Sequence, residues 1–589
     1  MAKKYRPVVR DQGFLLPPDM RDWLPADHGV WLVIAAVGRM DTSAFHAGRR
    51  TGGAGAAGYD PDMLVTLLVW AYAQGIVSSR RMESLCGQDV AFRVICGGSL
   101  PDHATIARFR AGFADGVVQL FTQVLILCAR LGMGRLGTVA LDGTKIRANA
   151  SKSANRSEEW LAGTAAERAA AHAETDAAED VLFGDACGDE VPAEAASPFT
   201  RDARIDAALA SARAERERRA AKREQQEEEQ AARAAEHVAA ARAGTPKTGK
   251  PPAGTEVELA EQRLAREHAA AQARYEQWQQ DRASTPAGGG RRRGRPPAPP
   301  GQHAGVARAR QQLEAARQRA ARAEARDRAE AVIVRNITDP DSRLMKTRDG
   351  FVQGYNGQQV VTADLLVIAT ELTDDPTDTG WYEPMMEQAQ AAAALIRARQ
   401  PPAADPGTAG PETAGSGGTG SEAAPGPGPE PVIALVLADA GYLSKDNLTC
   451  PGPDRLIATG KRRDLEKAAR AAAPGDAGPG DAGPGDNGED GSKAIAEMTA
   501  RLATEEGITS YRQRGHIAET PHGDLKHNMN FSQLSVRGKH RTSAEWRFAW
   551  TVHNLRMAIT SGHLTRHALT QLSSQATRQA PGTATTSTA

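Results

Sequence analysis

A long segment that lacks the residues for a core divides this chain into two parts. Between residues 151 and 333 the sequence consists largely of Ala, Arg, Glu and Gln, and large apolar side chains are rare. Such a composition favours helices, but it offers too little apolar surface for a conventional core. We therefore expect a helical insertion, with globular sequence before and after it.

Three helices are predicted in the insertion, near residues 203–243, 256–282 and 303–331. The favoured interpretation is a protruding helical hairpin or loose coiled coil, whose third helix extends about 43 Å at 1.5 Å per residue. The alternative is a set of exposed, charged helices that have no partner.

A basic sequence, Arg-Gly-Arg-Pro, separates the second and third of these helices and includes Arg293 and Arg295. It is similar to the core of an AT-hook, in which extended arginines enter the narrow minor groove of A·T-rich DNA. The flanking Gly and Pro residues favour a simpler reading, a basic linker that contacts phosphates without sequence preference. Both readings predict contact with DNA.

Composition excludes several classes of protein. At 589 residues the chain is too long for one compact domain, given about 100 to 200 residues per domain. No apolar run reaches the roughly 20 residues of a membrane span, and the N-terminal sequence lacks the features of a signal peptide. The five cysteines form no CxxC pair, so neither a disulfide framework nor a thiolate zinc site is predicted. We expect a cytoplasmic protein without a membrane partner.

Residues 1–135 are predicted to be entirely helical. Asp60-Pro61 is a helix start signal, and the apolar residues that follow it recur at helical spacing. Two more amphipathic stretches begin with Ser or Pro-Asp caps. Short helices joined by tight turns are typical of a helix-turn-helix-like module that binds DNA. Its candidate DNA contacts are the arginines near helix starts or on predicted exposed faces, namely Arg80, Arg81, Arg108 and Arg110.

A mixed α/β sheet is predicted from segments on both sides of the insertion. A short apolar run that ends in Asp142 indicates a buried strand with a carboxylate at its tip, and a second run ends likewise in Asp439. Two strands, QQVVTAD and LLVIATEL, and a helix lie between them in sequence, and one more strand and several helices follow. If the two Asp-bearing strands are neighbours, both carboxylates lie at one end of the sheet, where open α/β folds hold their ligands.

The remaining segments are predicted to lack fixed structure. Residues 401–430 and 472–492 are rich in Gly and Pro and are predicted to be flexible inserts. Residues 568–589 form a Ser/Thr/Gln-rich tail that is predicted to be disordered.

Three acidic residues are the candidate catalytic group: Asp142, Asp439 and, on a C-terminal helix, Glu519. Clustered carboxylates suit Mg²⁺, and two such ions activate a nucleophile and stabilise the leaving oxygen in displacement at phosphorus. Mn²⁺ is expected to substitute. Lys526 lies seven residues after Glu519, two turns along the same predicted helix, where its ammonium would meet a phosphate. Taken singly, an Asp at a strand end is more often a cap, and a lysine is more often solvated.

Several of these segments together carry a family resemblance. VALDGTKIRANAS, NITDPDSRLMKTRDGFVQGYN, VLADAGYLS and HIAETPHGDLKHN closely resemble bacterial insertion-sequence transposases of the DDE type, most like the insertion-sequence family 1182 group. The resemblance covers roughly residues 10–155 and 333–560.

The resemblance implies an RNase H-like catalytic domain built from residues 136–150 and 334–567, after the helical N-terminal domain, with residues 151–333 inserted. It gives Asp142, Asp439 and Glu519 the places of the metal-binding triad. Tyr511, Arg514 and Lys526 then surround the third carboxylate and contact DNA. Three departures stand out: the spacing from Arg514 to Glu519 is one residue longer than in related transposases, His522 stands where Phe is common, and the two Gly/Pro-rich inserts are unusual.

By the same resemblance the chain binds the terminal inverted repeats of an insertion sequence and catalyses metal-dependent strand cleavage and strand transfer. Its partners are double-stranded DNA, at the transposon ends and the target, and further copies of itself in a homodimer or higher assembly, associated with the nucleoid. The alternative is a catalytically inactive relic that acts only as a sequence-specific DNA-binding protein.

Charge distribution agrees with a DNA-cutting site, although the formal net charge is zero. Residues 501–567 hold ten Lys or Arg against five Asp or Glu, together with seven of the 14 histidines. A basic wall lets phosphates approach carboxylates that would otherwise repel them; the alternative is a solvated helix face. Glu545 is a rival third carboxylate, but no lysine follows it at seven residues, and Trp546, Phe548 and Trp550 around it indicate packing.

Overall fold

The computed structural model describes residues 19–47, 58–168, 170, 201–243, 252, 254–283, 296–401, 432–460 and 489–579. It divides into two compact units, one made of residues 1–154 and 341–589 and the other of residues 155–340. The second unit corresponds to the predicted insertion, with slightly later bounds than expected. Both predicted flexible inserts lie almost entirely outside the described residues, as do Arg293 and Arg295.

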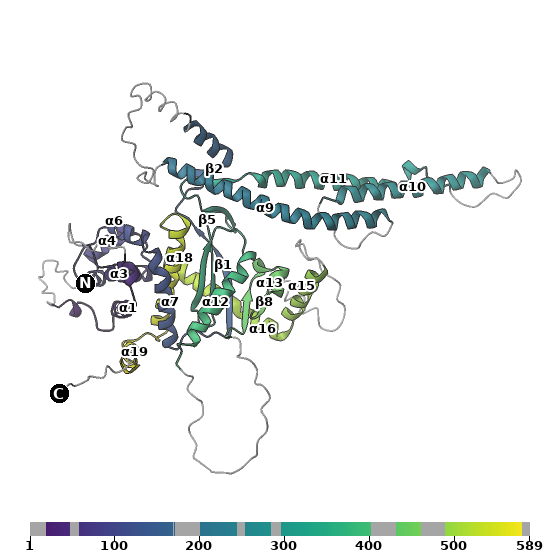
Figure 1. The fold of residues 1–589 in the computed structure, drawn as a ribbon. Helices are drawn as coiled ribbons and strands as arrows, with labels where there is room; N and C mark the ends of the chain where they lie inside the picture. Colours follow the sequence, from purple (N-terminus) through teal and green to yellow (C-terminus); the bar gives the residue numbers. More distant parts are fainter. Residues whose placement is uncertain are drawn as a thin grey trace, which may run out of the picture. The chain divides into compact units, whose positions relative to one another are not determined.

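Short capped helices form the N-terminal part of the first unit (Figure 1). The side chains of Asp60 and Asp102 accept hydrogen bonds from backbone N–H groups of Asp62 and Thr105, at 2.9 and 2.8 Å, so the expected start signals do cap helices. Among the described residues no single helix is long and apolar enough to cross a membrane, although α6 and α7, joined at a 77° bend, pass that test as a pair. The elements are η1 (Met20–Asp22), α1 (Gly29–Val37), α2 (Ser43–His46), α3 (Pro61–Ala73), α4 (Ser79–Gln88), α5 (Val90–Ile95), α6 (His103–Ala111) and α7 (Ala114–Arg130).

A six-stranded mixed sheet is the centre of the first unit. Its strand order is β4-β5-β1-β7-β8, and β6 also pairs with β5. β1 is antiparallel to β5 and parallel to β7, so the two Asp-bearing strands are neighbours. The mixed α/β prediction is therefore confirmed, but the edge strand β4 was not foreseen from the sequence. The strands are β1 (Thr138–Arg147), β4 (Arg343–Thr347), β5 (Gly350–Thr362), β6 (Val367–Thr373), β7 (Leu435–Ala438) and β8 (Asp454–Ile457).

The first strand is longer than its apolar run indicated. Pairing with β5 continues from Val139 to Arg147, so Asp142 lies in the middle of β1 and the prediction of a strand tip was wrong. The apolar run ends at Leu141 because the strand loses its parallel partner there: β7 ends opposite Leu141, at Ala438. Beyond that point, within the described residues, β1 has no strand on this edge, apart from an isolated bridge between Arg147 and Gln533, and most of its residues are polar and half-buried.

Helices cover both faces of the sheet (Figure 1). α18 packs against β6 and α7, and Trp546 packs on Gly357 of β5, where a Cβ atom would lie 2.3 Å from the indole. Trp546, Phe548 and Trp550 are fully buried, as packing residues should be.

The prediction that residues 568–589 are disordered was wrong for the start of this segment, because α19 extends to Gln579. The elements are η5 (Thr379–Trp381), α12 (Tyr382–Arg397), η6 (Ala440–Tyr442), α13 (Lys445–Thr449), α15 (Glu489–Leu502), α16 (Glu505–Arg514), η7 (Gly515–Glu519), α17 (Thr520–Gly523), η8 (Asp524–Asn528), α18 (Lys539–Thr560) and α19 (Arg566–Gln579).

The second unit contains the three expected long helices and a small ladder. β2 and β3 pair antiparallel where the chain enters and leaves the unit. α10 and α11 pack along each other, with Val306, Ala309 and Leu313 of α11 buried, so these two helices form a hairpin as favoured. Arg317 and Glu261 form an ion pair across it at 2.9 Å. The elements are β2 (Asn155–Ser157), α9 (Arg201–Arg242), α10 (Glu256–Ala283), η4 (Pro300–Gln302), α11 (Ala304–Ala331) and β3 (Val334–Asn336).

A buried polar network joins the N-terminal helices to α18. Glu545 is fully buried; it accepts a hydrogen bond from the Tyr72 hydroxyl at 2.8 Å and another from the Ser535 backbone at 2.8 Å. Arg110, also buried, donates to the Val77 carbonyl at 2.6 Å and lies 3.4 Å from the Tyr72 hydroxyl. Glu545 is thus a structural acid, and the expected exposed position of Arg110 was wrong.

Glu545→Ala should lower the free energy of unfolding by about 3 kcal/mol, because it leaves the Tyr72 hydroxyl and the buried Arg110 charge without their acidic partner. Urea denaturation followed by tryptophan fluorescence measures the change. The matched control is Glu497→Ala, which removes an exposed acid and should cost under about 0.5 kcal/mol. Equal midpoints for the two variants would contradict a structural role for Glu545.

Candidate active site

Two carboxylates meet where β1 and β7 diverge. The last paired residues of the two strands are Leu141 and Ala438, and the next residue of each is an aspartate, Asp142 and Asp439. Asp439 begins the turn η6, and its carboxylate accepts a hydrogen bond from the Gly441 backbone at 2.9 Å. The parallel register therefore brings the two predicted acids side by side at the edge of the sheet.

Arg514 lies between these two acids. Its Nη2 atom donates to Asp142 Oδ1 at 2.8 Å and lies 3.6 Å from Asp439 Oδ2, and the side chain is only 14 % exposed. One buried guanidinium thus balances the charge of two neighbouring carboxylates.

The two aspartates differ in acidity. Burial would raise the pKa of Asp142, but contact with His522 and the charge of Arg514 bring this pKa below its ordinary value. Burial raises the pKa of Asp439, and the negative charges of Asp142 and Asp378 add to this effect beyond what Arg514 offsets. Asp142 therefore gives up its proton more readily than Asp439 does.

Lys526 and Tyr511 also reach this region. Lys526 Nζ donates to Thr144 Oγ1, two residues beyond Asp142 on β1, at 2.6 Å, and burial lowers the pKa of this lysine. The Tyr511 hydroxyl donates to the Ala438 carbonyl at 3.2 Å. The structure therefore gathers Asp142, Asp439, Tyr511, Arg514 and Lys526 around one point.

Glu519 is close but does not join the two aspartates. Its side chain is exposed, and within the described residues no hydrogen bond or ion pair connects it to Asp142 or Asp439. Its charge contributes to the raised pKa of Arg514. The expectation that Glu519 and Lys526 share a face assumed regular α-helix, whereas η7 and η8 are π-helical turns, which hold more residues per turn and so change the angle between the two side chains.

His522 occupies the inner face of the same helical segment. Its Nε2 atom lies 3.6 Å from Asp142 Oδ2 and contacts the Gln359 side chain, and its ring packs edge-on against Trp550. The sequence identified His522 only as a departure from the family pattern. In the structure it lies beside Oδ2 of Asp142, while Arg514 contacts Oδ1.

Asp378 is a fourth acid that the sequence did not single out. Its Oδ1 atom accepts hydrogen bonds from Asn356 at 2.6 Å and Gln358 at 2.8 Å, and lies 3.4 Å from Lys145 Nζ. It approaches β1 over Gly143, where a Cβ atom would lie 2.6 Å from its carboxylate. Because Asp378 precedes η5 in a sequence rich in Asp, Thr and Pro, it is indistinguishable from a turn residue by pattern alone.

The donor set fits a hard divalent cation. Asp142 and Asp439 present carboxylate oxygens to a shared point that already holds a positive group, the Arg514 guanidinium. Oxygen donors from carboxylates are the ligands that Mg²⁺ and Mn²⁺ prefer. A cation bound by both aspartates would have to share or replace the contacts of Arg514.

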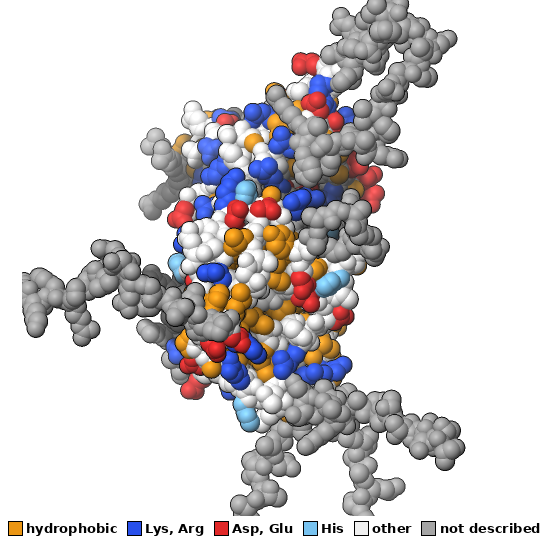
Figure 2. Space-filling view, turned by 90° about the vertical axis from the view of Figure 1, so that its left-hand side faces the viewer, with side chains coloured by type: hydrophobic (Ala, Val, Ile, Leu, Met, Phe, Trp, Pro, Cys, Tyr) orange, Lys and Arg blue, Asp and Glu red, His pale blue; other side chains and the backbone are white. Residues whose placement is uncertain are grey.

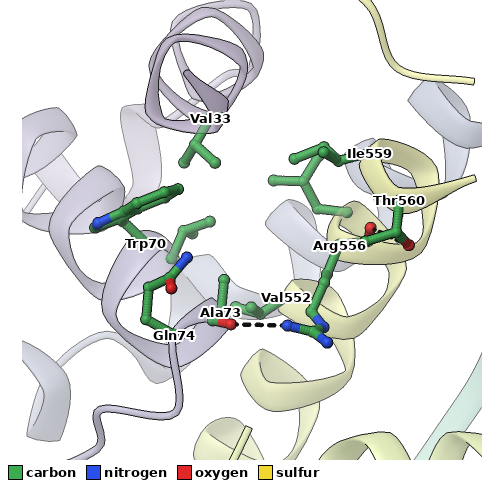
Figure 3. Close-up of a pocket in the computed structure, with 11 residues that line it drawn as sticks. Val33, Trp70, Ala73, Gln74, Val552, Arg556, Ile559 and Thr560 are labelled. Atoms are coloured by element: carbon green, nitrogen blue, oxygen red, sulfur yellow. Dashed lines mark hydrogen bonds between the residues drawn. The ribbon is translucent and has the colours of Figure 1, made fainter. Parts of the chain in front are cut away.

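A cavity lies elsewhere in the first unit. About 160 Å³ in volume, it is lined by apolar side chains of α1, α3 and α18, including Val33, Trp70 and Ile559 (Figure 3). Arg556 donates to the Ala73 carbonyl at its margin, at 3.1 Å. Because this cavity contains no group of acids, we do not assign the chemistry to it.

Two segments of the chain match models of transposase families. Residues 18–112 match a family model described as "Transposase domain (DUF772)", and residues 488–558 match one described as "Transposase DDE domain". The first match covers the N-terminal helices; the second includes Arg514, Glu519 and Lys526. Over these two segments the chain is similar to transposases, and over the second to the DDE domain of transposases. No curated protein and no solved structure matches the chain.

Asp524 fixes the helical segment that carries Lys526 to α18. Its carboxylate lies 2.8 Å from His553 Nδ1 and 3.1 Å from Arg556 Nη2, and accepts from Asn528 at 2.8 Å. Burial would raise its pKa, but the hydrogen bond with His553, supported by Asn528 and Arg556, lowers the pKa from 3.8 to about 2. Ionised Asp524 therefore stabilises the folded state.

Asp524→Asn should lower stability by about 3 kcal/mol near neutral pH, because it removes the charge from a buried ion pair. A depressed folded-state pKa contributes stability that is complete above the ordinary pKa and lost as the pH falls toward about 2. Urea denaturation at several pH values should therefore show the gap between wild type and variant closing between about pH 4 and pH 2. A gap that does not change with pH would contradict this assignment.

Proposed function

We propose that this protein is a metal-dependent transposase that cleaves DNA at the ends of an insertion sequence and joins those ends to a target. The observation that carries the proposal is the pair Asp142 and Asp439, side by side where two parallel strands part and held by one largely buried cation. Glu519, from the helical segment next to them, is the proposed third acid. The family group remains the one named from the sequence, family 1182.

The architecture supports an RNase H-like reading of the catalytic domain. Three antiparallel strands, β6, β5 and β1, continue into the parallel pair β7 and β8, and the acids lie where β1 and β7 part. The DDE match covers the helices that deliver Arg514 and Lys526. Both features support the proposal of an RNase H-like catalytic domain.

Metal binding fits the same residues. Asp142 and Asp439 would hold Mg²⁺, with Glu519 as the third ligand, and Mn²⁺ would substitute. Bound there, the ions would supply Lewis-acid activation of a nucleophile and stabilisation of the leaving oxygen at phosphorus. Lys526, next to Asp142 and partly buried, is placed to hold a phosphate oxygen of the DNA. His522 and Arg514 keep Asp142 ionised and oriented.

Recognition of the element's ends is assigned to the N-terminal helices. Arg80 and Arg81 lie exposed in the first turn of α4, and Arg108 is exposed on α6. The face in Figure 2 mixes basic, acidic and apolar side chains instead of presenting one uniform charge. Such a surface suits base-specific contacts combined with phosphate contacts. The proposed partners are double-stranded DNA and further copies of this chain on that DNA.

One observation favours the inactive, DNA-binding alternative. Glu519 is exposed and makes no contact with the aspartate pair, and Arg514 lies between the two acids. The active reading requires the helical segment to adjust when DNA and metal bind. π-helical turns flank α17, and such turns allow a helix to change register locally.

Asp142→Asn, Asp439→Asn and Glu519→Gln should each lower strand cleavage in Mg²⁺ by about 1,000-fold, or about 4 kcal/mol of transition-state stabilisation. Binding to a duplex that carries the element's end should change little. A gel assay measures cleavage and fluorescence anisotropy measures binding, with Glu497→Gln as the control. Full cleavage by any one variant would remove that residue from the triad, and absence of cleavage by the wild type would favour the inactive alternative.

Arg514→Gln should tighten Mn²⁺ binding about tenfold, because the ion no longer competes with a guanidinium for the two carboxylates. Asp142→Asn should weaken it. Isothermal titration calorimetry without DNA measures both changes independently of activity. Weaker binding by the Arg514 variant would show instead that the guanidinium preorganises the carboxylates for the ion.

A further inference from the structure

Two exposed arginines lie where β1 leaves the sheet. Arg147 is the last residue of β1; its guanidinium donates to the Ser532 hydroxyl at 3.1 Å and to the Ser532 carbonyl at 3.5 Å. Arg537 donates from Nε to the Asn149 carbonyl at 2.9 Å. Asn149 in turn donates to the Ser535 carbonyl at 2.7 Å, so residues 147–149 and 532–537 form one connected surface.

These arginines are held by neutral groups only. In the part of the chain that the structure describes, neither Arg147 nor Arg537 has a carboxylate within 4.0 Å. Three other cations of this region are paired with acids: Lys145 with Asp378, at 3.4 Å, and both Arg343 and Lys539 with Asp374, at 2.7 and 2.9 Å. Hydrogen bonds to neutral oxygens orient a guanidinium and leave its charge available. That combination suits a phosphate and not a structural ion pair.

The strand sets the distance from these arginines to the acids. Arg147 follows Asp142 by five positions on one continuous extended strand. At about 3.3 Å per residue this separation is about 17 Å, the length of about five base pairs at 3.4 Å each. Because side chains five positions apart leave opposite faces of a strand, one duplex meets both residues at the edge of β1 that β7 leaves, where Gln533 pairs with Arg147 and Arg514 contacts Asp142. In the other direction from Asp142, Leu141, Ala140 and Val139 are fully buried. Along β1, the side chains available to contact a phosphate therefore lie on only one side of the acids.

We propose that Arg147 and Arg537 bind the phosphate backbone of duplex DNA about five base pairs from the cleaved bond, on one side only. This inference rests on the proposed function, because it takes Asp142 as the position of cleavage. The contact is independent of base sequence and fixes how far the duplex extends past the acids. The ligand is double-stranded DNA, recognised through its phosphates.

The test is a double variant, Arg147→Ala with Arg537→Ala, compared with a matched control, Arg135→Ala with Arg399→Ala. The control also removes two exposed arginines; Arg135 precedes β1 at its opposite end, and Arg399 follows α12. The probe is a duplex that carries the element's end. Its binding is measured by fluorescence anisotropy over a range of salt concentrations, and its phosphate contacts are mapped by ethylation interference.

The slope of log K against log salt should be less steep by about 1.8 in the Arg147/Arg537 variant, for two lost phosphate contacts, and unchanged in the control. Interference should disappear at one cluster of phosphates, about five base pairs to one side of the cleavage position, and persist elsewhere. An unchanged slope with normal wild-type cleavage would overturn the inference and leave the proposed function intact. The reduced slope without any wild-type cleavage would support the surface as a DNA contact and count against the proposed function.

Discussion

Two aspartates that follow directly after paired residues of parallel strands create the central constraint of this structure. The register Leu141 to Ala438 places Asp142 and Asp439 next to each other, and like charges at such a distance repel unless a cation lies between them. Arg514 is that cation in this structure. Because Arg514 ends α16, the position of the whole C-terminal helical segment depends on the aspartate pair, and so do Lys526, His522 and the exposed Glu519.

The same segment is fixed from its other side by α18. Asp524 joins it to His553 and Arg556, while Glu545, near the start of α18, reaches the N-terminal helices through Tyr72. α18 thus contacts the sheet, the proposed catalytic segment and the proposed DNA-recognition helices within the first unit. Asp524 and Glu545 are largely buried, and each accepts several hydrogen bonds that hold these elements together. We therefore interpret these two acids of the C-terminal region as structural and not catalytic.

The sequence predicted the parts of the fold that depend on local pattern. Helix starts at Asp60 and Asp102, the three insertion helices and the neighbouring Asp-bearing strands all follow from caps, periodicity and apolar runs. Prediction from the sequence failed where tertiary contacts determine the position of a residue. Asp142 lies within a strand because β5 extends it, Arg110 is buried because Glu545 and Tyr72 surround it, and Asp378 joins the site through a close approach at Gly143. The π-helical turns beside Glu519 have no signal in residue spacing, which assumes a regular helix.

The insertion also delays completion of the sheet during synthesis. β1 has its partners in β5 and β7, roughly 200 and 300 residues further along the chain. At about 5 to 20 residues per second, β1 waits at least about 10 seconds for β5 to emerge from the ribosome. During that interval the apolar stretch Val139–Leu141 lacks its strand partners, while the next residues to emerge are the charged helices of the second unit. Once β3 has emerged, the β2–β3 ladder pairs residues 155–157 with residues 334–336, so its closure shortens the span of chain across which β1 must find β5.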